Sequence, residues 1–403
     1  MANQPMIPGS QVVAYVMRET SFGTPRKPAG ADALLPIDIT LTPTQEREAR
    51  DDRSSSSDYA ESVEGRYSAT WEITKYLMPS GTAGVSPDDH HLLNAGFGNS
   101  SGSATCCEYS LATAHTTSLT IRRGARANHA DLSDFQDHVD GAIVNRIEFG
   151  WGSQGRNNLA TVTYGGPAKE WGWTGNSTLN PDRPQNASHL TGNVTADTSL
   201  QFTKGSVFQI EKQAGVWDTA GGSGALITSI NVTNHMLYFA ETLNASHSGD
   251  DVIKPYNPTA ITSGSPIHAK LGWLSLDGGT SQVRHLGGKI TFEDNRELLA
   301  DEYGQDSATE VLRKGKRNVT YTMDFYAKKT EMGDILGKAR RGTNLHIQVL
   351  LGEQSGKRVR FRMKNCESNV MGVDLPDNDM GRYTLSGRAY GVNGNDSFRV
   401  QIV

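Results

Sequence analysis

Short segments in which apolar and polar residues alternate recur along the whole chain, and each predicts a β-strand with one buried and one solvated face. In the segment 67–74 the odd positions are apolar or aromatic and the even positions are polar, and the segment 318–325 has the same parity. Successive side chains of a strand point to opposite faces, so both segments should belong to sheets packed on one side. Two interpretations stay open: a half-solvated antiparallel sheet, or a sheet whose wet face lines a water-filled conduit.

The order of these elements occurs twice, which indicates an internal duplication. The paired segments, in chain order, are 12–16 with 270–274, 38–42 with 289–293, 64–74 with 314–324, 118–124 with 346–352, and 159–166 with 383–391. Sequence identity between the copies is low, so the shared order is the main argument. The chain is therefore expected to contain two β-rich units.

Each copy also carries a short helix signal after its second strand. In the first copy Ser86 is the expected N-cap, Pro87 the first helical residue, and Gly96 the end. In the second copy the helix is expected to begin at Thr330-Glu331.

We expect a first unit over 1–166, a linking β-rich segment over 167–266 and a second unit over 267–403. The middle segment is rich in Gly, Ser, Thr, Asn and Pro, yet 199–211 and 226–240 have strand-like patterns. Either a small inserted β module or a pair of long hairpins would fit this pattern.

Two long acidic segments, 44–64 and 294–313, separate strands that a hairpin loop of about two to five residues would normally join. We expect both to be loops, the first disordered in the isolated chain and ordered against a neighbouring subunit. Their acidic residues include Glu46, Glu48, Asp51, Asp52, Asp58, Glu61 and Glu64 in the first segment and Glu297, Asp301, Glu302, Asp306 and Glu310 in the second.

Composition and charge argue against several classes of protein, including tight nucleic-acid binders and membrane-spanning helical proteins. The 403 residues carry a formal net charge of −5, which argues against tight binding of nucleic acid through clustered Lys and Arg. Apolar runs are too short for a membrane helix of about 20 residues, and the N-terminal sequence does not resemble a secretory signal. The odd count of 3 cysteines argues against a disulfide framework and favours folding in a reducing cytoplasm.

No catalytic or cofactor motif stands out. The densest ligand-like cluster is Asp88-Asp89-His90-His91, but consecutive residues of a helix cannot all face one metal ion. We therefore expect no cofactor, no metal site and no enzymatic activity, although catalytic triads can be assembled from scattered residues.

The ordered, duplicated set of elements resembles the tail tube (major tail) proteins of long-tailed bacteriophages, in particular the subgroup with two fused tube domains. The segments that carry the resemblance are 33–43, the acidic segment that follows, 67–81, and the short helix around 91–98. It covers roughly 10–166 and 267–403, and the middle segment departs from it.

The resemblance implies a mainly β fold with short helices, in which two tandem tail-tube-like β-sandwich or barrel domains contribute strands to an oligomeric closed β-barrel. It implies a structural protein of a long non-contractile (siphovirus) tail, assembled in the host cytoplasm. Homotrimeric, pseudo-hexameric rings would stack into a hollow tube that conducts DNA during genome ejection. The implied partners are further copies of the chain, the tape measure protein, the tail terminator and tail tip proteins, and double-stranded DNA in transient passage without specific binding; no membrane is implied.

Strand geometry supports three chains per ring. Eight strands from one chain would close on a bore filled by side chains, whereas 24 strands give a barrel of about 48 Å at ~4.8 Å spacing and ~40° tilt. A duplex passes through such a bore. We expect the wall strands to carry acids but no Lys or Arg, so that like charge keeps phosphates off the wall. The expected lumen residues are Thr40, Thr42, Ser68, Thr70, Glu72, Thr74, Thr291, Glu293, Asn318, Thr320, Thr322 and Asp324.

A carbohydrate-binding or fibre-type β-sandwich module of a virion is the alternative. It rests on the region that contains Trp151, Trp171, Trp173 and Asn176.

Overall fold

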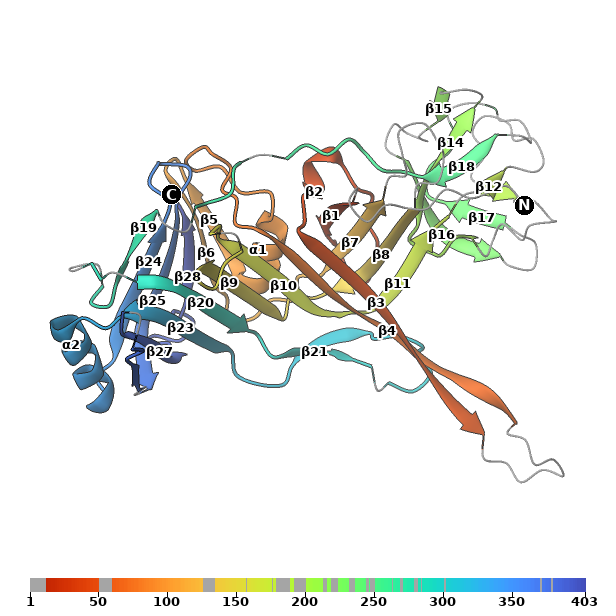
Figure 1. The fold of residues 1–403 in the computed structure, drawn as a ribbon. Helices are drawn as coiled ribbons and strands as arrows, with labels where there is room; N and C mark the ends of the chain where they lie inside the picture. Colours follow the sequence, from red (N-terminus) through yellow and green to blue (C-terminus); the bar gives the residue numbers. More distant parts are fainter. Residues whose placement is uncertain are drawn as a thin grey trace.

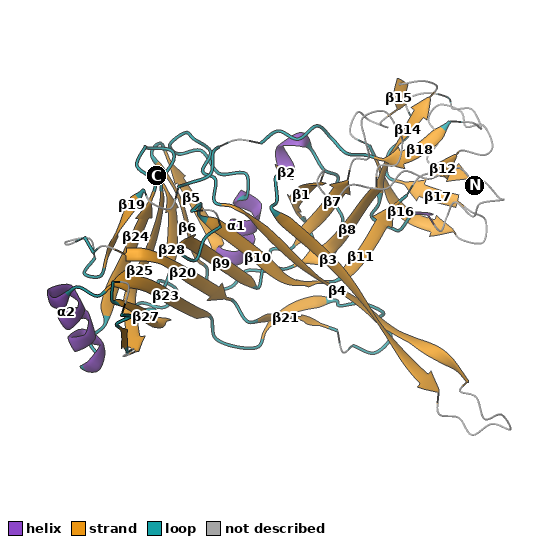
Figure 2. Cartoon of the chain, in the orientation of Figure 1, coloured by secondary structure: helices purple, strands orange, loops and turns teal. Residues whose placement is uncertain are grey.

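The computed structural model describes residues 12–403 except 51–59, 126–134, 157, 176, 179–188, 192–200, 213–215, 219–223, 232–235, 244–245, 247–250, 263, 269–270, 279–281, 284, 301, 370–371 and 378–379. The described chain is mainly β, as the sequence predicted, with two short α-helices (Figure 2).

A long antiparallel sheet of 14 described strands runs through both halves of the chain (Figure 1). Its strands in spatial order are β3 (Asp38–Arg50), β4 (Ala60–Tyr76), β10 (Thr161–Ala168), β9 (Arg146–Gly152), β20 (His285–Glu293), β23 (Asn318–Tyr326), β27 (Arg382–Ala389), β25 (Val359–Asn369), β28 (Arg399–Ile402), β6 (Cys106–Leu111) and β5 (Gly98–Ser103). Off this path, β24 (Leu345–Leu351) pairs with β25, β19 (Gly272–Ser275) with β24, and β26 (Val373–Asp374) with β27.

The remaining described strands form three smaller sheets. A five-stranded sheet has the order β11 (Glu170–Thr174), β8 (Phe135–Ala142), β7 (Leu119–Ala125), β1 (Val12–Arg18) and β2 (Ala33–Leu34). A seven-stranded sheet contains β12 (Ser177–Thr178), β18 (Val252–Pro255), β14 (Val207–Lys212), β16 (Ala225–Asn231), β17 (Met236–Phe239), β13 (His189–Thr191) and β15 (Val216–Asp218). The fourth sheet is the hairpin of β21 (Arg296–Leu299) and β22 (Glu310–Arg313).

The two halves repeat the same strand pairings. The order β3-β4-β10-β9 in the first half matches β20-β23-β27-β25 in the second. Likewise β1 pairs with β7 as β19 pairs with β24, and β11 pairs with β8 as β28 pairs with the start of β25. The two repeats meet side by side, because β9 of the first pairs with β20 of the second from Gly152↔Gly287 to Arg146↔Glu293.

One hydrophobic core extends across this joint. Its aromatic centre combines Phe97 and Phe149 from the first half with Phe292, Phe361 and Phe398 from the second. The seven-stranded sheet has a separate core around Phe208 and Ile253. The strands from β12 to β18 therefore form a small β module, one of the two forms that the sequence left open for the middle segment, and this module lies at one end of the molecule in Figure 1.

The helix boundaries differ from the sequence expectation in the first half. α1 spans His90–Phe97 with Asp89 at its N-cap, so Ser86 and Pro87 precede it, and Gly98 rather than Gly96 ends it in the left-handed conformation. Gly96 lies inside the helix, where a Cβ would be 2.4 Å from Ile147 Cδ1, so glycine there permits close packing of the helix on β9. α2 spans Lys329–Arg340, close to the expected start. Neither described helix is long and apolar enough to cross a membrane.

The expectation of loops over 44–64 and 294–313 was wrong for most of their described residues. β3 and β4 continue as a twisted hairpin, with Thr44 opposite Ser68 and Arg47 opposite Glu64, and this hairpin projects far from the body (Figure 1). In the second segment β21 and β22 form a hairpin of their own. The two are connected where the Tyr67 amide donates to the Asp306 carbonyl at 2.9 Å.

Candidate functional site

The candidate site is the polar face, the side of strands β3, β4, β10, β9, β20, β23 and β27 opposite the hydrophobic core. Cross-strand partners lie on the same face of a sheet. One row of such partners crosses the joint between the repeats and contains Thr40, Glu72, Gly165, Arg146, Glu293 and Asn318. The face is therefore continuous through both repeats.

The structure brings all twelve expected lumen residues onto this face. Five are exposed, namely Thr40, Thr42, Ser68, Thr70 and Glu72. Seven are half-buried, namely Thr74, Thr291, Glu293, Asn318, Thr320, Thr322 and Asp324. The residues that alternate with them on each strand are buried in the core, with even numbers on β20 and odd numbers on β3, β4 and β23; the exception is Tyr67, which is 45% exposed.

The expectation that this face lacks Lys and Arg was wrong. Lys289 has the same parity as Thr291 and Glu293 on β20, and β9 contributes Arg146. Both cations pair with Glu148, at 2.6 Å from Lys289 Nζ and 2.5 Å from Arg146 Nη2. β27 adds Arg388, opposite Thr320 and Glu367, and Arg382. The face is thus a mixed-charge surface in which bases lie among acids.

Hydrogen bonds between neighbouring strands hold several of these side chains in place. Asp324 accepts from Ser153 Oγ at 2.9 Å, from Gln154 Nε2 at 3.2 Å and from Thr384 Oγ1 at 2.9 Å. The Thr74 and Thr163 hydroxyls lie 2.9 Å apart across β4 and β10. Beside Thr40, Glu72 and Arg146 the surface is hollowed by a cavity of about 440 Å³. The face can present fixed hydroxyls, amides and paired charges to water.

The acidic residues of the two segments that were expected to be loops lie on the two hairpins or next to them. Glu46, Glu297, Glu302, Asp306 and Glu310 are exposed. Glu48, Glu61 and Glu64 belong to the β3–β4 hairpin, while Asp51, Asp52, Asp58 and Asp301 lie outside the described residues.

The base of the β21–β22 hairpin is fixed by Asp294, which the sequence indicated only as one of the acids of the 294–313 segment and not as a buried carboxylate. Asp294 is fully buried and contacts three guanidinium groups: Arg296 Nε at 2.6 Å, Arg317 Nε at 2.7 Å and Arg313 Nη2 at 2.9 Å. Arg296 also donates to the carbonyls of Ala95 and Val144, at 2.9 and 2.7 Å, and so ties this hairpin to the first repeat.

His115 lies beside this cluster, with its Nε2 3.8 Å from Asp294 Oδ2 and 2.9 Å from the Ala95 carbonyl oxygen. Burial, reinforced by the charge of Arg296, lowers the pKa of His115 to about 4. His115 is therefore neutral in the folded protein near neutral pH.

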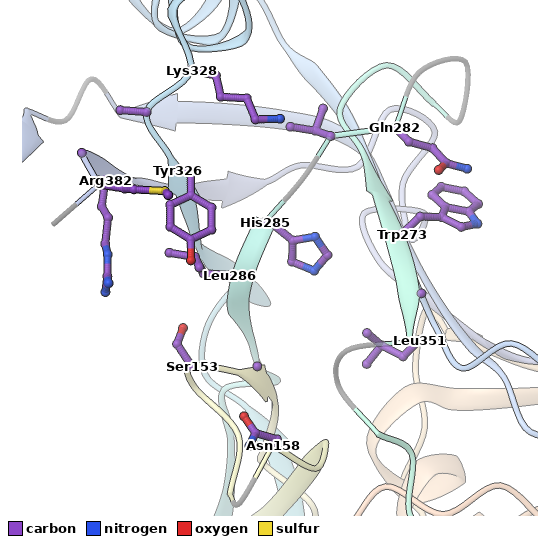
Figure 3. A pocket seen from close by; sticks show the side chains of 16 residues that line it. Ser153, Asn158, Trp273, Gln282, His285, Leu286, Tyr326, Lys328, Leu351 and Arg382 are labelled. Carbon is purple, nitrogen blue, oxygen red and sulfur yellow. The ribbon is translucent and has the colours of Figure 1, made fainter.

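A larger cavity of about 1130 Å³ opens where β9 and β23 end and β20 and β27 begin. Figure 3 shows Trp273 and Gln282 on one side of it, His285 near its centre, and Tyr326 and Arg382 on the other side. The residues that line this cavity come from segments far apart in the sequence, so no local pattern predicted it. We call it the joint cavity, because Gly152 and Ser153 of the first repeat also line it.

The remaining sequence candidates have structural roles. Asp89 accepts from Tyr164 Oη at 2.8 Å and lies 3.5 Å from Lys75 Nζ within the core. His90 Nδ1 lies 2.8 Å from Tyr109 Oη. Among the described residues no three His, Cys, Asp or Glu side chains are grouped to hold a metal ion.

The aromatic residues of the alternative interpretation do not form an exposed platform in the described structure. Trp151 is fully buried and stacks on Phe361, and Trp171 and Trp173 are half-buried with ring centroids 5.2 Å apart. Asn176 lies outside the described residues.

Comparison with known proteins gives one match over most of the chain. A family model described as phage tail tube protein matches residues 9–389. Among solved structures, one chain of the virion of a native gene transfer agent (GTA) particle is 16% identical. That match covers 30% of this chain and 93% of the other, with a TM-score of 0.25. No curated protein matches the chain.

Proposed function

Because this chain belongs to the phage tail tube protein family, as the match over residues 9–389 shows, we propose that its copies close into rings that stack into a hollow tube. The chain is a structural tail tube protein of a virion. The ring, its stoichiometry and the parts that line or join it are our proposals.

The joint between the two repeats is the observation that carries this proposal. Inside one chain, β9 of the first repeat pairs with β20 of the second. At the two ends of the same row, β3 pairs only with β4 and β26 only with β27 among the described strands. Each chain therefore offers two sheet edges that correspond to the two partners of its internal joint.

The internal joint also predicts the register between chains. The repeat relates Thr44 to Glu293 and Asn369 to Arg146, and Glu293 lies opposite Arg146. Thr44 of one copy should therefore lie opposite Asn369 of the next. In the same way, the pairs Lys289↔Gly150 and Asp374↔Arg382 place Thr40 opposite Asp374.

Three chains form the smallest closed ring whose bore admits a DNA duplex. Eight wall strands per chain make 24 strands, and these give a diameter of about 48 Å at the backbone. We place the polar face, with its twelve expected lumen residues, on the inside of this barrel. Its paired charges and hydroxyls would keep water on the wall and leave phosphates no run of free cations to bind.

We assign the two hairpins to contacts between successive rings. The β3–β4 hairpin extends beyond the wall along the strand direction (Figure 1). Its acidic residues, with those of the 294–313 segment, would meet the next ring. Partners at the ends of the tube would be the tape measure, terminator and tip proteins of a long non-contractile tail, and DNA would pass during genome ejection. Assembly would take place in the host cytoplasm.

The chain is divided, in this proposal, into a first tube unit over 1–166, a central β module over 167–266 and a second tube unit over 267–403. The strand pairing of the first unit continues to Thr174, because β10 reaches Ala168 and β11 pairs with β8.

A cysteine pair tests the ring directly. Thr44→Cys with Asn369→Cys, under oxidation, should yield covalent dimers and trimers in denaturing gels and a trimer mass in solution. The single variants are the controls. A purified chain that stays monomeric at high concentration, with no rings or tubes in electron micrographs, would overturn the proposal.

A further inference from the structure

In the first repeat, an extended segment closes the end of the wall beside β4 and β10. The Leu77 amide donates to the Ala160 carbonyl at 2.9 Å. Ile267 continues this pairing: its amide donates to the Leu77 carbonyl at 3.1 Å, and its carbonyl accepts from the Ala160 amide at 3.0 Å. The Ile267 side chain is only 4% exposed. The segment that precedes β19 is therefore built into the first repeat.

The same segment also covers strand β1 of the five-stranded sheet. The Tyr15 hydroxyl donates to the Pro258 carbonyl at 2.6 Å, and the Ile261 amide donates to the Gly30 carbonyl at 2.8 Å. Tyr15 is 1% exposed as a result. The described residues of the range 258–268, which are all but residue 263, thus run from Tyr15 to Leu77 and Ala160.

The second repeat has the matching groups, and they line the joint cavity. Its Ala327 amide donates to the Gly381 carbonyl at 2.7 Å, as Leu77 does to Ala160. Trp273 occupies the place of Tyr15, since Ala14 pairs with Arg123 of β7 as Gly272 pairs with Leu351 of β24. Among the described residues, the two backbone hydrogen bonds that Ile267 makes with Leu77 and Ala160 have no counterpart at the Ala327 carbonyl and the Gly381 amide. Ala327, Gly381 and Trp273 all border the cavity of about 1130 Å³.

The repeat also identifies which residues of the chain correspond to the segment that pairs with Leu77 and Ala160 in the first repeat. With Ala14 equivalent to Gly272, residues 259–269, which precede β19, correspond to residues 1–11, which precede β1 and lie outside the described residues. Pro8 then corresponds to Pro266, and Gly9 to Ile267.

The direction of the chain indicates which copy supplies it. Residues 258–268 lie on the first repeat and lead into β19 of the second, so they cross the joint between repeats. In a ring, the next copy's first repeat follows a second repeat in the same way. We infer that residues 1–11 of one copy fill the joint cavity of the preceding copy and add an extended segment to its Ala327 and Gly381 edge. This inference rests on the proposed ring.

A second cysteine pair tests the inference. Leu159 and His268 form an antiparallel bridge in the first repeat, and their equivalents are Met380 and Ser10. Met380 lines the cavity and is 69% exposed. Partners in antiparallel bridges have Cα separations that disulfides accept. Ser10→Cys with Met380→Cys should therefore give covalent dimers and trimers under oxidation, whereas each single variant should give at most a tenth as much.

Deletion of residues 1–11 supplies a second readout. We expect the deleted chain to fold, as judged by circular dichroism, and its rings to dissociate at a concentration at least tenfold higher than those of the full chain. A synthetic peptide of residues 1–12 should restore the rings.

The outcomes separate the two proposals. If the full chain forms no rings, and Thr44→Cys with Asn369→Cys gives no cross-link, the proposed function fails. If that pair cross-links while Ser10→Cys with Met380→Cys does not, and the deletion leaves ring stability unchanged, the ring stands and the inference about residues 1–11 is overturned.

Discussion

The ring of Phe149, in the first repeat, lies with its centroid 4.7 Å from that of Phe361, in the second. Both side chains are essentially fully buried. Trp151 stacks on the same Phe361 ring, at 5.9 Å. The two repeats therefore share one packed interior instead of being two domains connected by a linker.

Replacing Phe149 by Ala tests this shared core. Removal of a buried aromatic side chain leaves a cavity and should lower the free energy of unfolding by about 3–5 kcal/mol. Because both repeats pack on this ring, they should unfold in one transition, which chemical denaturation followed by tryptophan fluorescence and circular dichroism would show. Leu375→Ala, at a side chain 73% exposed, is the matched control. Two separate transitions, with only one of them shifted, would contradict a common core.

Gly152 is the last residue of β9 at the joint, and its replacement by Ala should weaken the joint. Its φ is +62°, and a Cβ there would lie 2.2 Å from the Leu286 carbonyl oxygen. We expect a loss of about 1–3 kcal/mol in unfolding free energy. Gly102→Ala meets no atom within 4 Å and should change stability by less than about 0.5 kcal/mol. Equal stability of the two variants would show that the backbone there adjusts without cost.

Removing the carboxylate at position 294 should be strongly destabilising. In Asp294→Asn three guanidinium groups lose the anion that they surround, and two of them, Arg296 and Arg317, are largely buried. Breaking a buried ion pair in this way costs about 3–5 kcal/mol. Thermal unfolding measures the loss, and Glu297→Gln, at an exposed pair with Lys314, should have almost no effect. Comparable losses in the two variants would contradict the role of the buried cluster.

The buried His115 should make stability depend on pH on the acid side. Its folded pKa of about 4 lies below the ordinary value of 6.5, so the unfolded chain binds a proton that the folded chain does not. The contribution of His115 is fully present above pH 6.5 and is lost as the pH falls toward 4, by up to about 3 kcal/mol. His115→Gln should flatten the curve of unfolding free energy between pH 6.5 and 4 and leave its shape unchanged between pH 7 and 8. If His115→Gln left the fall in unfolding free energy between pH 6.5 and 4 unchanged, that fall would belong to other titrating groups.

The charge at position 72 tests the role of the polar face. Glu72 is exposed on this face, in the row of cross-strand partners that crosses the joint between the repeats. If the face lines the bore, Glu72→Lys should leave tubes intact and raise their retention of DNA at low salt by about tenfold, with the effect lost at high salt. Glu72→Gln is the control that removes the acid without adding a base. Infectivity of assembled virions should fall with the Lys variant only; equal retention and infectivity in all three would rule out this position as a DNA-facing charge.

The alternation of side chains was enough to predict the wall strands and their two faces. In 67–74 and 318–325 a packed core selects the apolar positions, so the pattern is visible without any alignment. The basic residues of the face were missed because Arg146 and Arg388 come from strands other than those whose alternation was read. Lys289 was overlooked although it shares the parity of Thr291.

The hairpins could not be predicted by the same rule. Residues 44–47 of β3 have no buried face, since the hairpin leaves the body there, and so both of their sides are polar. A polar ribbon and a polar loop have the same sequence pattern, and the distinction depends on backbone pairing. The pairing of β28 with β6, more than 280 residues apart, left no local signal either.

The central β module occurs once per chain, whereas the wall strands occur twice. In a ring of three chains the inner surface would therefore repeat every sixth of a circle, and the module only every third. A protein that binds such a tube through these modules would have three equivalent binding sites per ring, although the bore would have nearly sixfold symmetry.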